Sequence, residues 1–172
     1  PEGFRFVLKA SQRITHRSRL VNTEETIHFL ARALAHLGDK AGPVLFQLPP
    51  NFKQDTERLA DFLASLPDDM RATFEFRHPS WDNEATRTVL QAHGAALCTA
   101  DSDEVAEPEI HPTADFGYLR LRREAYGPEE LAALAERIRA QPWSEVYVFW
   151  KHELDGAGPD LAKAFQAAFE AR

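Results

Sequence analysis

Short runs in which bulky apolar residues alternate with polar ones recur along the chain and predict six strands. Between them, apolar residues at helical spacing follow Asp, Asn or Thr capping residues, which predicts intervening helices. The expected strands are residues 4–9, 43–48, 73–76, 95–99, 116–121 and 146–150. The expected helices are 23–37, 56–66, 84–93 and 128–140, with a terminal helix that begins near Pro159.

Two polar segments lack either period and are expected to be loops, residues 10–21 and residues 103–115. The second is acidic and contains proline, and a lid is the alternative interpretation. Elsewhere strands and helices alternate with short links, so the strands should pair in parallel through right-handed crossovers. The predicted class is therefore α/β.

Six such units fit either an open doubly wound sheet or part of a (β/α)8 barrel. Central strands of an open sheet are apolar on both faces, whereas these strands carry polar residues at their ends on one consistent face. The pattern favours a TIM-type barrel. With 172 residues, 44% of them hydrophobic, and no shift in composition, we expect a single (β/α)-barrel domain over residues 1–172.

The net charge of −7 argues against bulk binding to nucleic acid and against attachment to an anionic membrane surface. Cys98 is the one cysteine, so no internal disulfide can form and a reducing compartment is expected. No apolar stretch approaches the length of about 18 residues that a membrane helix needs, and the first residues do not form a signal peptide. A cytoplasmic protein is the expectation.

The segment TFEFRHPSW, residues 73–81, concentrates reactive side chains at the end of one strand. Phe74 and Phe76 share one face of this strand, so Glu75 points to the other. Arg77, His78 and Trp81 follow directly. Because α/β folds place their sites at the carboxyl ends of strands, this segment predicts a functional site.

Other strands also end in a polar or charged side chain, and in a barrel these ends converge on one mouth. The strand-end residues are Lys9, Gln47, Glu75, Asp101, Arg120 and Lys151, and the residues just beyond them include His16, Arg77, His78, Arg122 and His152. Cations outnumber carboxylates in this set, although the whole protein is acidic. Such a ring would attract a small anion, such as a phosphate or carboxylate, and reject polyanions.

Glu75 and Asp101 are the candidates for acid–base catalysis, and Lys9 or Lys151 for an electrophilic or Schiff-base role. The ordinary alternative for each is a solvated strand end or a structural ion pair, and Trp81 is typical of a packing residue at a helix entrance. The chain has no CxxC, HExxH or HxH motif, so neither a metal nor another cofactor is supported.

Several blocks resemble the YecE-like family, also called domain of unknown function 72. They are FRFVLKASQRITH, LGDKAGPVLFQLPPNF, FEFRHPSW, ADSD, YLRL and VFWKHELDGAGPDLA, in this order. The resemblance implies a TIM-type barrel from which roughly the first two β/α units are missing. Because the chain also begins with Pro1 and reaches a strand by Phe4, we expect an amino-terminally truncated fragment.

The resemblance also implies which positions belong to the site. The positions that match family blocks are Lys9, Thr15, His16, Gln47, Pro49, Glu75, Arg77, His78, Trp81, Asp101, Arg120, Lys151 and His152. The family often has a histidine and a glycine after the YxRL strand, where this chain has Arg122 and Arg123. Because the family has no assigned activity, the resemblance implies an architecture and a site and names no reaction.

The leading hypothesis is an enzyme that acts on a small anionic, phosphorylated or sugar-like substrate by acid–base chemistry at the barrel mouth. Glu75 would be the acid or base, and His16 or His78 a second proton carrier. The anion clamp would consist of Lys9, Arg77 and Arg120, with Gln47, Asp101, Trp81, Lys151 and His152 as further substrate-binding residues. The alternatives are a metal-dependent phosphoesterase or nuclease using Glu75, Asp101 and the histidines, and a non-catalytic module that binds a metabolite or a protein.

Overall fold

The computed structural model describes residues 1–102, 105, 107–150 and 156–171. Its backbone divides into two compact units, residues 1–97 and residues 98–172, and each is described by itself. Within the described residues, no helix is both long enough and apolar enough to span a membrane.

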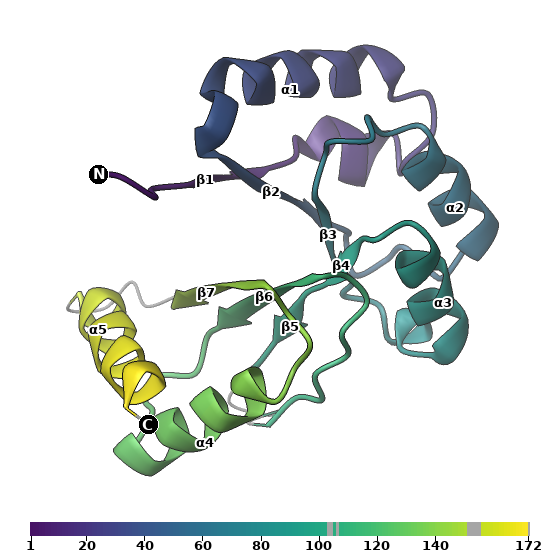
Figure 1. Cartoon of the computed structure of the whole chain (residues 1–172). Coiled ribbons are helices and arrows are strands. Elements are labelled where there is room, and N and C mark those ends of the chain that lie inside the picture. The colour runs from purple at the N-terminus through teal and green to yellow at the C-terminus, as the bar shows by residue number, and fades with distance from the viewer. Residues whose placement is uncertain (103–104, 106, 151–155, 172) are drawn as a thin grey trace. The chain divides into compact units, whose positions relative to one another are not determined.

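The first unit is a four-stranded parallel sheet with the strand order β1-β2-β3-β4 (Figure 1). Its strands are β1 (Phe6–Lys9), β2 (Ala41–Gln47), β3 (Ala72–Glu75) and β4 (Ala96–Leu97). The connecting helices are α1 (Glu24–Leu37), α2 (Thr56–Ala64) and α3 (Glu84–Ala92). Asp55 and Asn83 cap α2 and α3 by accepting from backbone amides at 3.0 and 3.1 Å, which agrees with the expectation of Asp, Asn or Thr capping residues at helix starts.

One face of this sheet packs against the helices through aromatic side chains. Phe46 and Phe74 are register partners on β2 and β3, both fully buried, with ring centroids 5.3 Å apart. Phe62 of α2 meets Phe46 edge-on at 5.3 Å. Because side chains alternate along a strand, the next residues, Gln47 and Glu75, lie on the opposite face. The hydrophobic core thereby sets the direction of the polar strand ends.

The second unit is a three-stranded parallel sheet with two helices. Its strands are β5 (Thr99–Ala100), β6 (Phe116–Leu121) and β7 (Glu145–Trp150), and its helices are α4 (Pro128–Arg139) and α5 (Ala157–Glu170). Strands β6 and β7 pair over six residues, from Phe116 opposite Glu145 to Leu121 opposite Trp150. The buried core joins β6 to both helices through Leu119, Leu131, Ala135, Ile138 and Phe165.

Alternating helices and parallel strands confirm the α/β class, whereas closure into a barrel and a single domain stay predictions. The strand predicted at 95–99 was wrong as one element, because its residues form two short strands that belong to separate sheets. The loop predicted at 10–21 was also wrong in part, since residues 13–17 form one π-helical turn, η1 (Arg13–Arg17). Its Ser18 amide donates to the Arg13 carbonyl at 2.9 Å, and a single turn is too short to show a helical period.

Candidate functional site

Three polar residues form a hydrogen-bonded chain across the ends of β1, β2 and β3. Glu75 and Gln47 are register partners and are only 3% and 5% exposed. The Gln47 Nε2 atom donates to Glu75 Oε1 at 2.8 Å, and Lys9 Nζ donates to Gln47 Oε1 at 2.9 Å. An ammonium can only donate and a carboxylate only accepts, so the two neighbours fix the orientation of the amide.

Arg77 brings a second cation to Glu75. Its Nε atom lies 3.5 Å from Glu75 Oε1, and its side chain is 39% exposed whereas that of Glu75 is 4% exposed. Arg77 is two residues beyond the strand end, in the loop after β3. The carboxylate is therefore buried, and one of its cationic partners reaches solvent.

His16 belongs to the same cluster. The pKa of its imidazole is lowered, first by burial and then by the positive charges of Lys9 and Arg77. All three influences favour the neutral form of the ring. Its Nδ1 atom lies 2.8 Å from the hydroxyl of Thr15, and both residues are presented by η1.

His78 has a different environment. Its Nδ1 atom accepts the Ser80 amide at 3.1 Å and lies 2.8 Å from the Ser80 hydroxyl, so the ring caps the short 3₁₀ helix η3 (Pro79–Trp81). The cap occupies one ring nitrogen. Of the two histidines predicted as proton carriers, His16 is the one whose electrostatics involve the charged cluster.

Trp81 packs between the loops that follow β2 and β3. It is 2% exposed, its ring is stacked on Phe76 at 4.4 Å between centroids, and its Nε1 donates to the Phe52 carbonyl at 2.7 Å. These contacts match the packing interpretation of this tryptophan rather than a surface open to a ligand.

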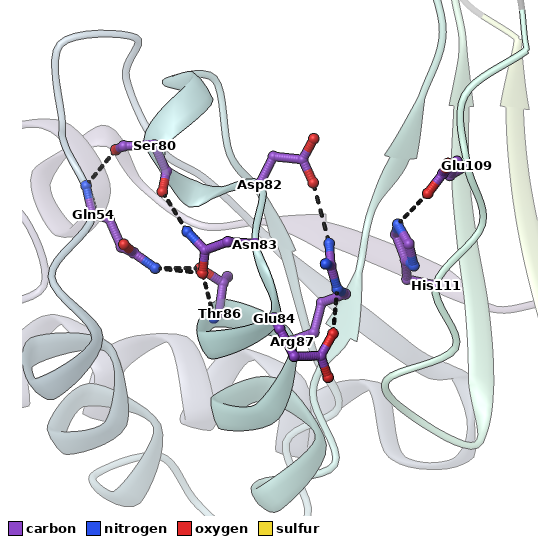
Figure 2. A network of polar contacts seen from close by, with 9 residues as sticks. All are labelled: Gln54, Ser80, Asp82, Asn83, Glu84, Thr86, Arg87, Glu109 and His111. Carbon is purple, nitrogen blue, oxygen red and sulfur yellow. Dashed lines mark hydrogen bonds and ion pairs between the residues drawn. The ribbon is translucent and has the colours of Figure 1, made fainter.

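A polar network joins the same two loops (Figure 2). The Gln54 backbone amide donates to Ser80 Oγ at 2.8 Å, and its side-chain amide donates to Asn83 Oδ1 at 2.8 Å and Thr86 Oγ1 at 2.9 Å. The Asn83 amide donates in turn to the Ser80 carbonyl at 2.7 Å. Together with Trp81, this network restrains the loop that carries Arg77.

In the second unit, Asp101 organises the loop after β6. Its Oδ1 accepts the Arg122 backbone amide and its Oδ2 accepts the Tyr126 hydroxyl, both at 2.5 Å. Burial and this bond to Asp101 raise the pKa of the Tyr126 phenol, which therefore stays protonated. Both oxygens of Asp101 thus have donors within the unit, and its predicted role in catalysis or substrate binding stays a prediction.

Arg123 extends that arrangement to the start of α4. Its guanidinium pairs with Glu130 at 2.7 Å and lies over the Tyr126 ring, 4.9 Å from the centroid. The pKa of Glu130 is lowered, chiefly by the Gly127 amide that donates to it at 2.7 Å and then by Arg123. Tyr126 and Glu130 were missed from the sequence, because no periodic or motif signal connects them with Asp101.

Most of the predicted site residues that the structure describes lie in the first unit, and a few lie in the second. The cluster in the first unit contains Lys9, His16, Gln47, Glu75 and Arg77, and is called the Glu75 cluster below. Asp101 and Arg120 lie in the second unit, and Lys151 and His152 fall outside the described residues. Convergence of all these residues on one mouth stays a prediction.

Metal ligands were considered separately. Among the residues that the structure describes, no group of three or more His, Cys, Asp or Glu side chains is placed to hold a metal ion.

A family model described as "Protein of unknown function DUF72" matches residues 1–172. The chain belongs to the DUF72 family. This confirms the resemblance found in the sequence. No curated protein matches the chain.

Two solved structures of DUF72 proteins resemble the chain. A DUF72 family protein from Thermotoga maritima MSB8 is 25% identical, with a TM-score of 0.82, 99% of this chain covered and 75% of that chain. A DUF72 family protein from Enterococcus faecalis V583 is 20% identical, with a TM-score of 0.78, all of this chain covered and 80% of that one. Neither description names an activity.

Proposed function

We propose that this DUF72 protein is an enzyme for a small anionic substrate and that Glu75 is its acid or base. The observation that carries the proposal is the buried Glu75 carboxylate, linked through Gln47 to Lys9 and paired with Arg77. A TIM-type barrel is part of the proposal, supported by parallel pairing in each unit and by the polar strand ends.

The charge of the cluster selects the substrate class. Lys9 and Arg77 bring two cationic donors to the cluster. A phosphate or carboxylate group would accept hydrogen bonds from both cations. Phosphorylated sugars and small organic acids carry such a group beside hydroxyl or carbonyl oxygens, and are the substrates we propose.

The surroundings of Glu75 suit proton transfer. Gln47 and Arg77 both face its Oε1 as donors, which matches a carboxylate that first acts as a base. Its burial limits competition from water. With the anionic group held by Lys9 and Arg77, a C–H or O–H proton of the substrate would be transferred to this carboxylate.

Turnover by the full chain tests this role. Each of a panel of sugar phosphates, hydroxy acids and keto acids is incubated with the protein, and products are followed by proton NMR. We expect Glu75→Gln to lower turnover by about 10²- to 10⁴-fold, the usual contribution of a positioned acid or base. The exposed Glu57→Gln on α2 is the matched control and should leave turnover unchanged.

The same assay separates the alternatives. Turnover that appears only with added Mg²⁺, Mn²⁺ or Zn²⁺ and is abolished by a chelator would replace the proposal with the metal-dependent phosphoesterase or nuclease. A compound that binds and is recovered unchanged under every condition would favour a binding module. Equal turnover by wild type and Glu75→Gln would contradict the role given to Glu75.

A further inference from the structure

Thr15 is the buried neighbour of His16 in the Glu75 cluster. We infer that Thr15 is a positioning residue that holds His16 in the tautomer protonated on Nε2, so that His16 meets the substrate as a hydrogen-bond donor. The inference rests on the proposed function of the same site, and it assigns the roles of the two ring nitrogens, which that proposal leaves open.

Two polar atoms lie within reach of the Thr15 hydroxyl. Thr15 is 1% exposed, and its Oγ1 lies 2.8 Å from His16 Nδ1 and 3.5 Å from the Ser11 carbonyl oxygen. That carbonyl already accepts the amides of Ile14 at 3.0 Å and Thr15 at 3.4 Å. The hydroxyl is thus closer to the imidazole ring than to the Ser11 carbonyl oxygen, which already has two donors.

Counting protons gives the tautomer. A hydroxyl carries one proton, and hydroxyl–oxygen hydrogen bonds are typically about 2.7–2.8 Å long, so 3.5 Å is a poor bond. If Nδ1 carried the ring proton, the hydroxyl would have to accept it and give its own proton to the distant Ser11 carbonyl. If Thr15 instead donates to Nδ1, its hydroxyl proton makes the short hydrogen bond and not the poor one to Ser11. The single proton of the neutral ring is then on Nε2.

The surroundings of the ring favour its neutral form. Partial burial disfavours the charged imidazolium most, and the positive charges of Lys9 and Arg77 act in the same direction. A neutral imidazole with Nε2–H can donate to a substrate oxygen as negative charge develops there, which supports base catalysis by Glu75. A hydrogen bond is donated in this role and no proton leaves the ring.

The backbone around Thr15 is held firmly. The turn η1 is closed by the Ser18 amide donating to Arg13, and the Leu20 amide donates to the Ile14 carbonyl at 3.0 Å. Ile14 is buried beside Thr15. Backbone hydrogen bonds and a buried side chain therefore fix the turn that presents Thr15 and His16.

Nitrogen-15 NMR of the full chain tests the inference without requiring turnover. The ring nitrogens of His16 are assigned by the signals that disappear in His16→Gln. At a pH where the ring is neutral, we expect Nδ1 in the unprotonated range and Nε2 in the protonated range. Wild-type protein with Nδ1 protonated would overturn the inference before any change is made at Thr15.

Substitutions then test the part played by Thr15. Thr15→Val should shift the two nitrogens toward the averaged values of mixed tautomers, and Thr15→Ser should restore the wild-type pattern. Thr73→Val is the matched control, because Thr73 is equally buried and its hydroxyl has no hydrogen-bond partner within the described residues. An unchanged tautomer in folded Thr15→Val would overturn the positioning role.

The tautomer inference and the proposed role of Glu75 can each be wrong without the other. If the tautomer is as inferred but Glu75→Gln retains full turnover, the acid–base proposal fails and the Thr15–His16 geometry stands. If Glu75→Gln is inactive but wild-type Nδ1 is protonated, the enzyme proposal stands and this inference fails.

Discussion

The side-chain amide of Gln47 donates to the carboxylate of Glu75 at 2.8 Å, and the two residues are register partners at the ends of β2 and β3. Lys9 binds the other end of the same amide at 2.9 Å. A buried carboxylate is therefore connected to an exposed ammonium through one neutral side chain.

Removing the amide should destabilise the first unit. Gln47→Leu takes a donor from the buried Glu75 carboxylate, and leaving such a group short of a partner costs about 1–3 kcal/mol. Urea unfolding measures the change. Gln166→Leu is the matched control, because Gln166 makes a similar 3.0 Å bond to Glu170 on the exposed face of α5. Equal effects of the two substitutions would contradict the importance of burial at Gln47.

The pKa of His16 should lie below its ordinary value of 6.5. A lowered native pKa means that the unfolded chain binds this proton more readily, so the stability from the neutral ring is complete above pH 6.5. It decreases as the pH falls from there toward the native pKa. An NMR titration of the ring protons measures the native value.

Lys9→Met should raise the pKa of His16, since it removes one of the two charges that lower it. Lys40→Met, at the amino end of β2, removes the same charge from an exposed position and should leave the titration unchanged. A native pKa at or above 6.5 in wild type would contradict the effect that burial and these two cations are given on His16.

Tyr126→Phe should destabilise the second unit. It deletes the hydroxyl that donates to Asp101 at 2.5 Å, and a hydrogen bond to a charged group contributes about 1.5–3 kcal/mol. Because the native pKa of Tyr126 is raised, its stabilising contribution is complete below the unfolded value of about 10 and is lost as the pH rises through the native pKa. Unfolding at a series of alkaline pH values measures both effects. An unfolding free energy in Tyr126→Phe equal to that of wild type would argue against this bond.

Thr73→Val should leave stability unchanged or raise it slightly. The Thr73 hydroxyl is fully buried on β3 and has no partner among the described residues, so an apolar group of the same shape removes an unsatisfied polar atom. Thr86→Val is the contrasting variant, because Thr86 is equally buried and accepts from Gln54 at 2.9 Å. It should lose about 1 kcal/mol. A loss at Thr73 as large as that at Thr86 would mean that the Thr73 hydroxyl is satisfied.

The regular parts of the fold could be predicted because they depend on periodicity. Alternation placed Phe74 with the helices and Glu75 on the other face, and capping chemistry located Asp55 and Asn83 at helix starts. Parallel order then brought Gln47 opposite Glu75. Each of these relationships follows from a rule that acts within one strand, one helix end or one β/α unit.

The features that the sequence did not predict depend on the paths of the loops. The bond between Tyr126 and Asp101 joins residues 25 positions apart, and nothing in either local sequence indicates it. His78 resembled a proton carrier because it follows a reactive strand end, yet its Nδ1 caps η3. The turn η1 is defined by one backbone bond and two buried side chains, which leave no repeating pattern.

The most direct test of the central claim is whether a small anion binds at the Glu75 cluster. Thermal unfolding of the full chain is followed with phosphate, phosphorylated sugars and organic acids, for wild type, Arg77→Ala and the control Lys40→Met. At about a hundred times its dissociation constant, a ligand adds about 2.7 kcal/mol to stability, and each kcal/mol raises the melting temperature by about 2–4 °C in a protein of this size. We expect an anion to stabilise wild type and Lys40→Met and to lose its effect in Arg77→Ala. Equal stabilisation of all three proteins, or of none, would contradict an anion site built around Glu75.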